Sequence, residues 1–541
     1  MIKTIEKFPI LSLTIIVLLM LLIHLDVPNI TIMEARNFIT SREMIQDNNW
    51  LLTTMNGEPR YQKPPLPTWL TAISAMLFGA NSLFALRLPA AFMVLFLGIF
   101  SYYFSLKLSL SKNHSFRNSL ILVTSFYVIG IINEAPWDIF AHGFMFAGLY
   151  FLFNFFEENK AIWKNAFLAA VFFGLSMLSK GPVSLFALFL PFLISYGIVF
   201  KFKTFKQKIV PFISFILLFL IIGSWWFIYV RYADPEAFLA IASRETDNWS
   251  SYNVKPFYYY WSFFIQSGLW TIPAFIGLLY PYMIHRVLHK KIYKFTFLWT
   301  IIAVVLLSTI PEKKARYLMP VLIPLALNTG FYIQFLIKEF SNLSKKKDTL
   351  PVYFNFGLIA TIGVSVPIIL YVILNDSLKL FITNYILTAV VLLIIGILLF
   401  RSLVQKNMKN TFYLSVCFLV SVFVFGLPIS KVFNKNEAFT PINSLHKYEE
   451  KHSINTYAIG NLTPEFIWDY NGKIKNIYKN NDIKTPTENK FGLLLSSENF
   501  NKISIELNTN YNLEFIKTYN LNVGAKQKDR LISQFYLVTK K

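Results

Sequence analysis

A small set of charged and tyrosine side chains in this sequence combines the two chemistries needed to move a group held by a phosphate. Lysine and arginine can neutralise a phosphate leaving group, and a carboxylate can take a proton from an attacking hydroxyl. Ionisable groups beside membrane-length apolar segments are costly unless they line a polar cavity, so their persistence indicates a site. The candidate carboxylates are Glu34 and Asp138, and the candidate substrate-binding residues are Arg36, Tyr61, Lys63, Lys180, Lys314, Arg316 and Tyr317.

Long apolar segments must position these residues. Of the 541 residues, 55% are hydrophobic and 17% aromatic, which is more than the core of a soluble protein can hide. Apolar runs such as 8–25 and 209–230 match a hydrocarbon layer about 30 Å thick. We therefore predict an all-α polytopic membrane protein with about thirteen spans. The expected spans are 8–26, 83–106, 117–133, 137–157, 162–179, 182–200, 209–230, 257–284, 295–310, 316–337, 352–374, 378–400 and 411–432.

The basic residues predict how the chain is oriented. The net charge is +22, but Lys and Arg are dispersed over alternate short loops between apolar runs, which argues against nucleic acid as a partner. Basic loops face the cytoplasm, so the N-terminus is expected on the cytoplasmic side of a bacterial inner membrane. The candidate residues and the C-terminal tail then all fall on the periplasmic side.

Three regions on that side are longer than turns: about 27–82, 231–256 and the tail from about 433. The first outer loop, about 27–82, has the patterns of helices at 32–45 and 66–78, the first resembling a helix that lies in the membrane interface. We expect a transmembrane domain over 1–432 and a small periplasmic α/β accessory domain over 433–541. The expected strands of the tail lie at 456–459, 474–478, 491–495, 513–516 and 535–538, and its expected helices at 463–470 and 500–507.

The sequence offers little for a metal or a cofactor. Cys417 is the only cysteine, so neither an intrachain disulfide nor a cysteine cluster is possible. His142, His285 and His289 lack the spacing of metal ligands, and no Asp-x-Asp motif is present to hold a nucleotide diphosphate through a metal. We predict no cofactor and leave a divalent metal open.

The order of several short motifs resembles the membrane glycosyltransferases of the GT-C fold, in particular the aminoarabinose transferases of lipid A and the protein O-mannosyltransferases. The matching residues are Glu34 to Arg36, Trp50-Leu51, Asn56-Gly57, Tyr61 to Trp69, Arg87 to Pro89, Asp138, Ser179 to Pro182 and Lys314 to Pro320. The resemblance covers roughly residues 1–340. It implies an inverting transfer of a sugar from a polyprenyl-phosphate donor to a lipid, glycan or protein acceptor at the periplasmic face.

Two acids of that family's pattern are missing. Where the family has the Asp that it is taken to use in catalysis, this chain has Met33, and where the aminoarabinose branch has Glu before the Lys of its Lys-Pro motif, this chain has Gln62. Three readings follow: Glu34 is the base, which we favour narrowly; Asp138 is the base; or the acceptor is already an anion and needs positioning rather than deprotonation.

Other interpretations stay open at this point. Arg36 fits a side chain reaching lipid headgroups, Tyr317 fits an interfacial aromatic, and Asp138 fits an ordinary loop acid. A transporter or flippase of an anionic polyprenyl-linked lipid is the alternative function, although its charges would be expected at the membrane midplane rather than at one face. The sequence names neither the sugar nor the acceptor.

Overall fold

The structure is a computed structural model that describes residues 2–203, 205–434, 436–479, 482–496, 510–524 and 526–541. Its residues group into two compact units. The first comprises Met1–Pro28 and Tyr61–Ile429, and the second comprises Asn29–Arg60 and Ser430–Lys541. A stretch of the first outer loop therefore clusters with the tail of the chain, although residues 61–429 separate the two in sequence.

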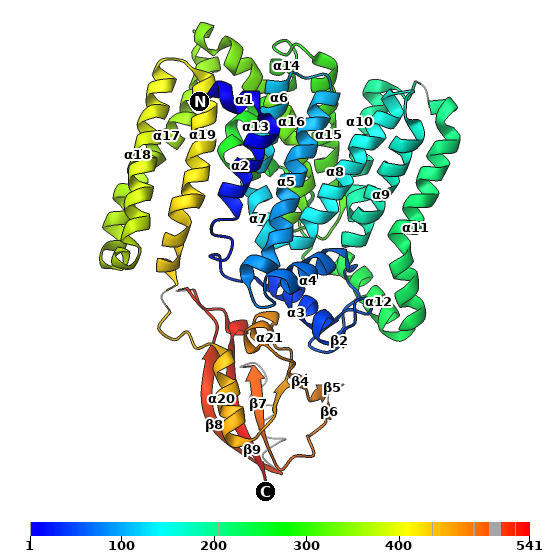
Figure 1. The fold of residues 1–541 in the computed structure, drawn as a ribbon, viewed down its shortest axis with the longest axis vertical. Helices are drawn as coiled ribbons and strands as arrows, with labels where there is room; N and C mark the ends of the chain where they lie inside the picture. Colours follow the sequence, from blue (N-terminus) through cyan, green and yellow to red (C-terminus); the bar gives the residue numbers. More distant parts are fainter. Residues whose placement is uncertain (1, 204, 435, 480–481, 497–509, 525) are drawn as a thin grey trace. The chain divides into compact units, whose positions relative to one another are not determined.

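The first unit is helical, and within the described residues nine of its helical segments are long and apolar enough to cross a membrane. A tenth span is possible if α6 and α7, which meet at a bend of 44°, count as one. Adjacent helices such as α17 and α18 lie side by side (Figure 1). The helices are α1 (Ile2–Lys7), α2 (Pro9–Leu21), α4 (Leu66–Phe78), α5 (Leu83–Lys107), α6 (Lys112–Val123), α7 (Phe126–Glu134), α8 (Pro136–Glu157), α9 (Ile162–Lys180), α10 (Leu190–Phe200), α11 (Ile209–Ala233), α12 (Pro235–Ser251), α13 (Thr271–Gly277), α14 (Tyr280–Met283), α15 (Lys290–Thr309), α16 (Met319–Glu339), α17 (Lys346–Leu374), α18 (Ile382–Val404) and α19 (Met408–Ser421).

The all-α polytopic class is confirmed, whereas the count of thirteen spans is not. Two expected spans are shorter than the length that crosses a bilayer as a single helix: Pro9–Leu21, and the segment Leu185–Phe200 that contains α10. A third, at 257–284, is not a continuous helix. It consists of two 3-10 segments, Phe257–Tyr260 and Phe263–Trp270, followed by the short α13 and α14.

The break within 257–284 has a local cause at Gly268. This residue has φ +63°, which side chains with a Cβ rarely adopt, and a Cβ built there would meet the Phe126 ring at 2.3 Å. Phe126 itself begins α7 immediately after the bend from α6, and Trp270 Nε1 donates to Thr124 Oγ1 at 2.8 Å beside it. Two interrupted segments therefore pack against each other at their interruptions.

The second unit is built on a sheet of five strands in the order β4-β3-β7-β9-β8. The strand β3 is parallel to both β4 and β7, whereas β9 is antiparallel to β7 and β8. The bounds are β3 (Thr456–Ile459), β4 (Lys475–Asn476), β7 (Lys490–Ser496), β8 (Tyr511–Asn520) and β9 (Ile532–Lys540), with α20 (Leu445–His452), α21 (Pro464–Tyr470) and a small β5–β6 pair (Tyr478–Lys479, Asp482–Ile483).

Strand periodicity explains how the sheet is buried. Along β7, Leu493 and Leu494 belong to different hydrophobic clusters, as expected for side chains that alternate between the two faces. The expected strands at 456–459, 491–495, 513–516 and 535–538 and the expected helix at 463–470 are present. The expected strand at 474–478 is divided between β4 and β5. The helix expected at 500–507 lies outside the described residues.

The first outer loop contributes α3 (Ile32–Gln46) and the hairpin β1–β2 (Thr54–Met55, Glu58–Pro59) to this second unit. Asn56 and Gly57 form the hairpin turn with φ of 58° and 74°, the left-handed pair that a tight two-residue turn requires. The Asn56 side chain also pairs with the backbone of Ile474, donating to its carbonyl and accepting from its N–H, both at 2.7 Å. The Asn-Gly motif thus serves the architecture of the loop.

Arg42 joins the loop helix to α21. Its guanidinium donates to the Ile467 carbonyl at 3.1 Å, the Trp468 carbonyl at 3.3 Å and Asn471 Oδ1 at 2.9 Å. Phe38 packs edge-on against the Trp468 ring at 5.5 Å. The helices expected at 32–45 and 66–78 are confirmed as α3 and α4, but α3 buries polar as well as apolar residues, unlike a helix that lies in an interface.

Candidate functional site

The chemistry-bearing residues of the first unit gather where α8 begins and α9 ends. Asp138 stands in the first turn of α8, which starts at Pro136, and Lys180 is the last residue of α9. Their side chains form an ion pair and are both buried, with 2% and 8% of the side chain exposed. Burial of such a pair out of contact with water is costly unless both charges are well partnered, so the pairing accounts for two charges that apolar segments would otherwise exclude.

A glycine shapes the end of α9. Gly181 follows Lys180 with φ +70° and ends the helix, and Pro182 prevents its continuation. The Ser-Lys-Gly-Pro motif therefore places Lys180 at a defined helix terminus.

A histidine completes the buried group around Asp138. His142 lies one turn further along α8, with its Nε2 3.8 Å from Asp138 Oδ1 and its Nδ1 2.9 Å from the Ser184 hydroxyl. Both side chains are buried. From the sequence alone, His142 is only a poor metal ligand and nothing points to Ser184. The one sequence signal that links the histidine to Asp138 is their i, i+4 spacing on a helix.

The segment that leads into α16 supplies the other cations. Lys180 Nζ lies 5.2 Å from the centre of the Tyr317 ring, Lys314 Nζ lies 5.7 Å from it, and the Arg316 guanidinium carbon also lies 5.7 Å from it. Cations at this distance from an aromatic ring interact favourably with its face or edge. The structure thus brings together Asp138, Lys180, Lys314, Arg316 and Tyr317, all of which the sequence singled out.

Glu312 limits the positive charge of this group. Its carboxylate pairs with Lys314 and accepts a hydrogen bond from the Tyr317 hydroxyl at 3.1 Å. The Lys313 ammonium has different partners. It donates to the carbonyls of Lys255 and Ile310, and burial lowers the pKa of Lys313. Lys313 therefore holds the adjoining loop together.

The Tyr61 to Trp69 motif of the same unit is anchored on α11. The Tyr61 hydroxyl donates to Asp234 Oδ2 at 2.8 Å, and burial, reinforced by Asp234, raises the pKa of Tyr61. Trp69 stacks on Trp225 with ring centres 6.2 Å apart. The role of Tyr61 in binding substrate stays a prediction, and Lys63 is half-buried in the same segment. Asp234 is not among the residues predicted from the sequence, although Asp before Pro235 is a typical helix start.

Glu34 and Arg36 belong to the second unit. Glu34 is fully buried and completes a capping box: its carboxylate accepts from the Thr31 N–H at 3.0 Å, and its own N–H donates to Thr31 Oγ1 at 3.3 Å. This role at the start of α3 accounts for an acid at this position without catalysis. Arg36 Nη1 lies 3.7 Å from Met33 Sδ, so the residue that replaces the family's Asp faces a cation.

A buried arginine that the sequence did not single out lies beside Arg36. Arg60 donates to the Arg36 carbonyl and to Thr40 Oγ1 at 2.6 Å. Burial, with a smaller contribution from the Arg36 charge, lowers the pKa of Arg60 to about 9. Among the residues that the structure describes, no three His, Cys, Asp or Glu side chains gather as ligands of a metal would.

Comparison with known proteins places these observations in a family context. The family model of dolichyl-phosphate-mannose-protein mannosyltransferases matches residues 62–228. The apo structure of ArnT from Cupriavidus metallidurans superposes with a TM-score of 0.66 over 99% of this chain and 98% of that one, at 14% identity. The chain has the GT-C fold. The resemblance to the aminoarabinose transferases and protein O-mannosyltransferases is thereby confirmed.

Several known proteins are also similar to this chain in sequence. An uncharacterised protein of Aquifex aeolicus is 26% identical over 56% of this chain and 60% of its own length. The undecaprenyl phosphate-alpha-4-amino-4-deoxy-L-arabinose arabinosyl transferase of Wigglesworthia glossinidia brevipalpis is 26% identical over 64% of this chain. The chain spans about three-fifths of the length of these two relatives, 60% and 61%. A transferase of that name from Proteus mirabilis is 25% identical over 79% of this chain and 76% of its own length.

Proposed function

We propose that this protein transfers a sugar from a polyprenyl-phosphate donor to a membrane-associated acceptor, with inversion at the sugar carbon. The observation that carries the proposal is the buried Asp138–Lys180 pair with Lys314 and Arg316 around Tyr317, at one end of a GT-C helical unit. A phosphate needs converging cations, and a reacting hydroxyl needs an adjacent carboxylate. Both are present within one group of side chains.

In the proposed reaction the acceptor oxygen attacks the anomeric carbon from the side opposite the phosphate. A carbon–oxygen bond to the acceptor forms while the bond between the sugar carbon and the phosphate oxygen breaks, and the electron pair leaves with the polyprenyl phosphate. Lys180, Lys314 and Arg316 stabilise the negative charge that develops on this leaving group, which lowers the barrier most in a site shielded from water.

Asp138 is the carboxylate that we assign to the proton of the acceptor. In the free protein its carboxylate is paired with Lys180. A donor phosphate that binds Lys180 competes for that cation and leaves the Asp138 carboxylate free to accept the proton of the acceptor. Glu34, whose carboxylate caps α3, is reassigned to positioning the first loop helix.

The relatives suggest which substrates to test first. Several are named as transferases of 4-amino-4-deoxy-L-arabinose from undecaprenyl phosphate, and a second ArnT structure with a TM-score of 0.63 is described as bound to undecaprenyl phosphate. We propose undecaprenyl-phosphate aminoarabinose as the first donor and a lipid A-like lipid as the first acceptor. The distribution of basic loops supports a reaction at the periplasmic face, with the N-terminus in the cytoplasm.

The proposal is tested by reconstituting the full chain with labelled donor and acceptor and measuring the glycosylated product by mass spectrometry. We expect Lys180→Met to lower transfer about 100-fold or more and Asp138→Asn by a similar factor, as for loss of a charge-stabilising group or a general base. Lys290→Met, which removes an exposed charge at the start of α15, is the matched control and should transfer normally.

Two results would contradict the proposal. Full transfer by both Lys180→Met and Asp138→Asn would remove this group of residues from the reaction. Movement of the labelled donor lipid from one leaflet to the other without any transfer would instead support the flippase alternative. Glu34→Gln separates the two carboxylates: it should lower thermal stability and leave the transfer rate of the folded fraction unchanged.

A further inference from the structure

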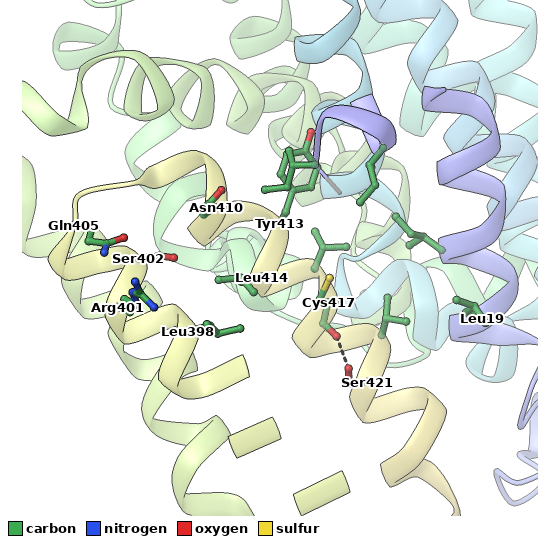
Figure 2. Close-up of a pocket in the computed structure, with 15 residues that line it drawn as sticks. Leu19, Leu398, Arg401, Ser402, Gln405, Asn410, Tyr413, Leu414, Cys417 and Ser421 are labelled. Carbon is green, nitrogen blue, oxygen red and sulfur yellow. Dashed lines mark hydrogen bonds between the residues drawn. The ribbon is translucent and has the colours of Figure 1, made fainter. Parts of the chain in front are cut away.

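A cavity in the helical unit lies among α1, α2, α18 and α19, formed by residues from both ends of that unit's sequence. Its volume is about 610 Å³. Figure 2 shows Leu398, Arg401, Ser402 and Gln405 along one helix, residues from Asn410 to Ser421 along the next, and Leu19 opposite them. None of the residues assigned above to phosphate binding or proton transfer lines this cavity.

The lining is polar at one end and apolar along the rest. Arg401, Ser402 and Gln405 stand at the end of α18, and Asn410 and Tyr413 stand at the start of α19. The lining continues along α19 to Ser421, roughly 16 Å further at 1.5 Å per residue. Apart from Ser421, the remaining lining residues are apolar or weakly polar: Ile2, Ile5, Ile16, Leu19, Leu398, Leu414, Val416, Cys417 and Val420.

The polar end carries a single charge. Arg401 is the only charged residue among those that line the cavity, no acid is among them, and its side chain is exposed. Within the described part of the chain its guanidinium has no ion-pair partner. Nearby cations are engaged: Lys409 pairs with Glu6, and Lys406 Nζ donates to the Leu343 carbonyl at 2.8 Å. The polar end therefore presents one available positive charge at the last turn of a membrane-length helix.

We propose that this cavity binds an anionic glycerophospholipid, with its phosphate on Arg401 and an acyl chain along α19. A cation at a membrane surface attracts anionic lipid headgroups, and an apolar groove leading away from it fits a hydrocarbon chain. Ser402, Gln405 and Asn410 supply uncharged hydrogen-bonding groups beside the phosphate. The inference does not depend on the proposed transferase activity, because it concerns a separate set of residues.

Cys417 makes the cavity directly measurable. It is the only cysteine of the chain, it is half-buried, and it lines the apolar part of the cavity. A thiol reagent therefore reports on this one position in the unmodified protein. Cys417→Ser provides the blank for any labelling of other groups.

The experiment compares the rate at which a maleimide modifies Cys417 in the full chain, reconstituted in phosphatidylcholine with and without phosphatidylglycerol. We expect phosphatidylglycerol to slow the modification. Arg401→Gln should weaken this protection, raising the phosphatidylglycerol concentration for half-protection roughly fivefold, the factor expected for one basic side chain at a membrane surface. Lys347→Gln, an equal charge change at the start of α17 and outside the cavity, should retain protection.

Four outcomes would overturn the proposal. Labelling unaffected by phosphatidylglycerol would show that no such lipid occupies the cavity, and equal protection by neutral phosphatidylethanolamine would show that headgroup charge is not recognised. Stronger protection by undecaprenyl phosphate than by phosphatidylglycerol would assign the cavity to a polyprenyl lipid. Protection that follows protein concentration, with a doubled mass in light scattering, would assign it to a second copy. If Arg401→Gln does not fold, the comparison of lipids on the unmodified chain still shows whether an anionic glycerophospholipid protects Cys417.

Discussion

At the scale of single residues, the same type of side chain is used for structure in one place and offered for chemistry in another. Glu34 is an acid held in a capping box at the start of α3, whereas Asp138 is an acid paired with Lys180 beside further cations. Burial does not distinguish them, since both are buried. Their contacts with Thr31 and Lys180 suit different roles, because backbone groups at a helix start are capped by Glu34, whereas Asp138 pairs with a cation that a phosphate could also bind.

Met33 offers a direct test at this scale. Its Sδ lies 3.7 Å from Arg36 Nη1 in the first turn of α3, and an Asp carboxylate oxygen is the same number of bonds from the backbone. We expect Met33→Asp to pair with Arg36 and to favour the helix N-terminus, which raises stability by about 0.5 kcal/mol. Thermal unfolding at low and high salt measures this, since salt should screen the gain.

Met33→Leu is the control, because it preserves volume without adding charge. Equal midpoints for the two variants would show that Arg36 is not available to an acid at position 33. A transfer rate that rises only in Met33→Asp would argue that a carboxylate here assists the reaction and would count against Asp138 as the base.

The carboxylate of Glu6 in α1 connects this helix to α6 and α19. It pairs with Arg117 of α6 and Lys409 of α19, accepts from the Tyr413 hydroxyl at 3.0 Å, and accepts weakly from Asn113 at 3.4 Å. Burial by itself raises the pKa of Glu6, but the hydrogen bonds from Lys409, Arg117 and Tyr413 outweigh it and hold the pKa below its ordinary value of 4.5. The ionised form is therefore the stabilising one.

The lowered pKa of Glu6 determines how its contribution to the stability of the protein changes with pH. The contribution of Glu6 is fully present above pH 4.5 and is lost as the pH falls through its lower folded-state pKa. We expect Glu6→Gln to cost roughly 3 kcal/mol at neutral pH, because it leaves the buried Arg117 and the half-buried Lys409 without their acid. Its thermal midpoint should also fall less steeply than the unmodified protein's below pH 4.5, and parallel curves for the two proteins would contradict this assignment.

At the scale of elements, interruptions rather than continuous helices determine how two segments of the helical unit meet. Gly268 interrupts the segment expected as a span at 257–284, and its backbone touches the Phe126 ring that begins α7. A single continuous helix there would have to displace that ring. The interruption is therefore specified by a contact with a distant part of the chain.

Gly268→Ala tests this contact. The added Cβ would require both an unfavourable φ and displacement of the Phe126 ring, so we expect a loss of about 2 kcal/mol or more in stability. Gly357→Ala in α17 is the matched control: a Cβ there meets nothing within 4 Å, and the change should be neutral or stabilising. Thermal unfolding in detergent measures both, and Phe126→Ala added to Gly268→Ala should recover part of the loss. Similar midpoints for Gly268→Ala and Gly357→Ala would show that the close approach is unimportant.

At the scale of the whole molecule, the second unit is assembled from two segments that residues 61–429 of the helical unit separate in sequence. Arg42 connects them through donations to two backbone carbonyls of α21 and to Asn471, and Lys473 adds an exposed pair with Asp47 at 2.7 Å. The buried pairing depends on the planar fork of a guanidinium, which presents several donors in fixed directions.

Arg42→Lys should therefore behave as a disruptive change although it keeps the charge. A lysine can replace only part of these hydrogen bonds, and the unsatisfied carbonyls cost roughly 1–3 kcal/mol. Hydrogen exchange should quicken in both α3 and α21, whereas Lys473→Met, which removes only the exposed pair, should leave it nearly unchanged. Faster exchange in α3 alone would show that Arg42 does not join the two segments.

The sequence by itself determined what depends on local pattern. Apolar length marked most of the membrane helices, the spacing of apolar and polar residues marked the helices at 32–45 and 66–78, and short β-prone runs marked most strands of the tail. The ordered motifs also indicated the resemblance to GT-C glycosyltransferases, and several of them mark a local feature such as the Asn56-Gly57 turn or the Lys180-Gly181 helix end. These features require only neighbours in sequence.

The tertiary structure decided what depends on contacts between distant segments. It paired Asp138 with Lys180, gave Glu34 to a helix cap, interrupted 257–284 at Gly268 and joined residues 29–60 to the tail. Each of these is set by the partner that packing brings within reach. Residue type and spacing restrict which partners are possible, but only the folded arrangement selects among them, because the energies of burial and ion pairing depend on the three-dimensional surroundings.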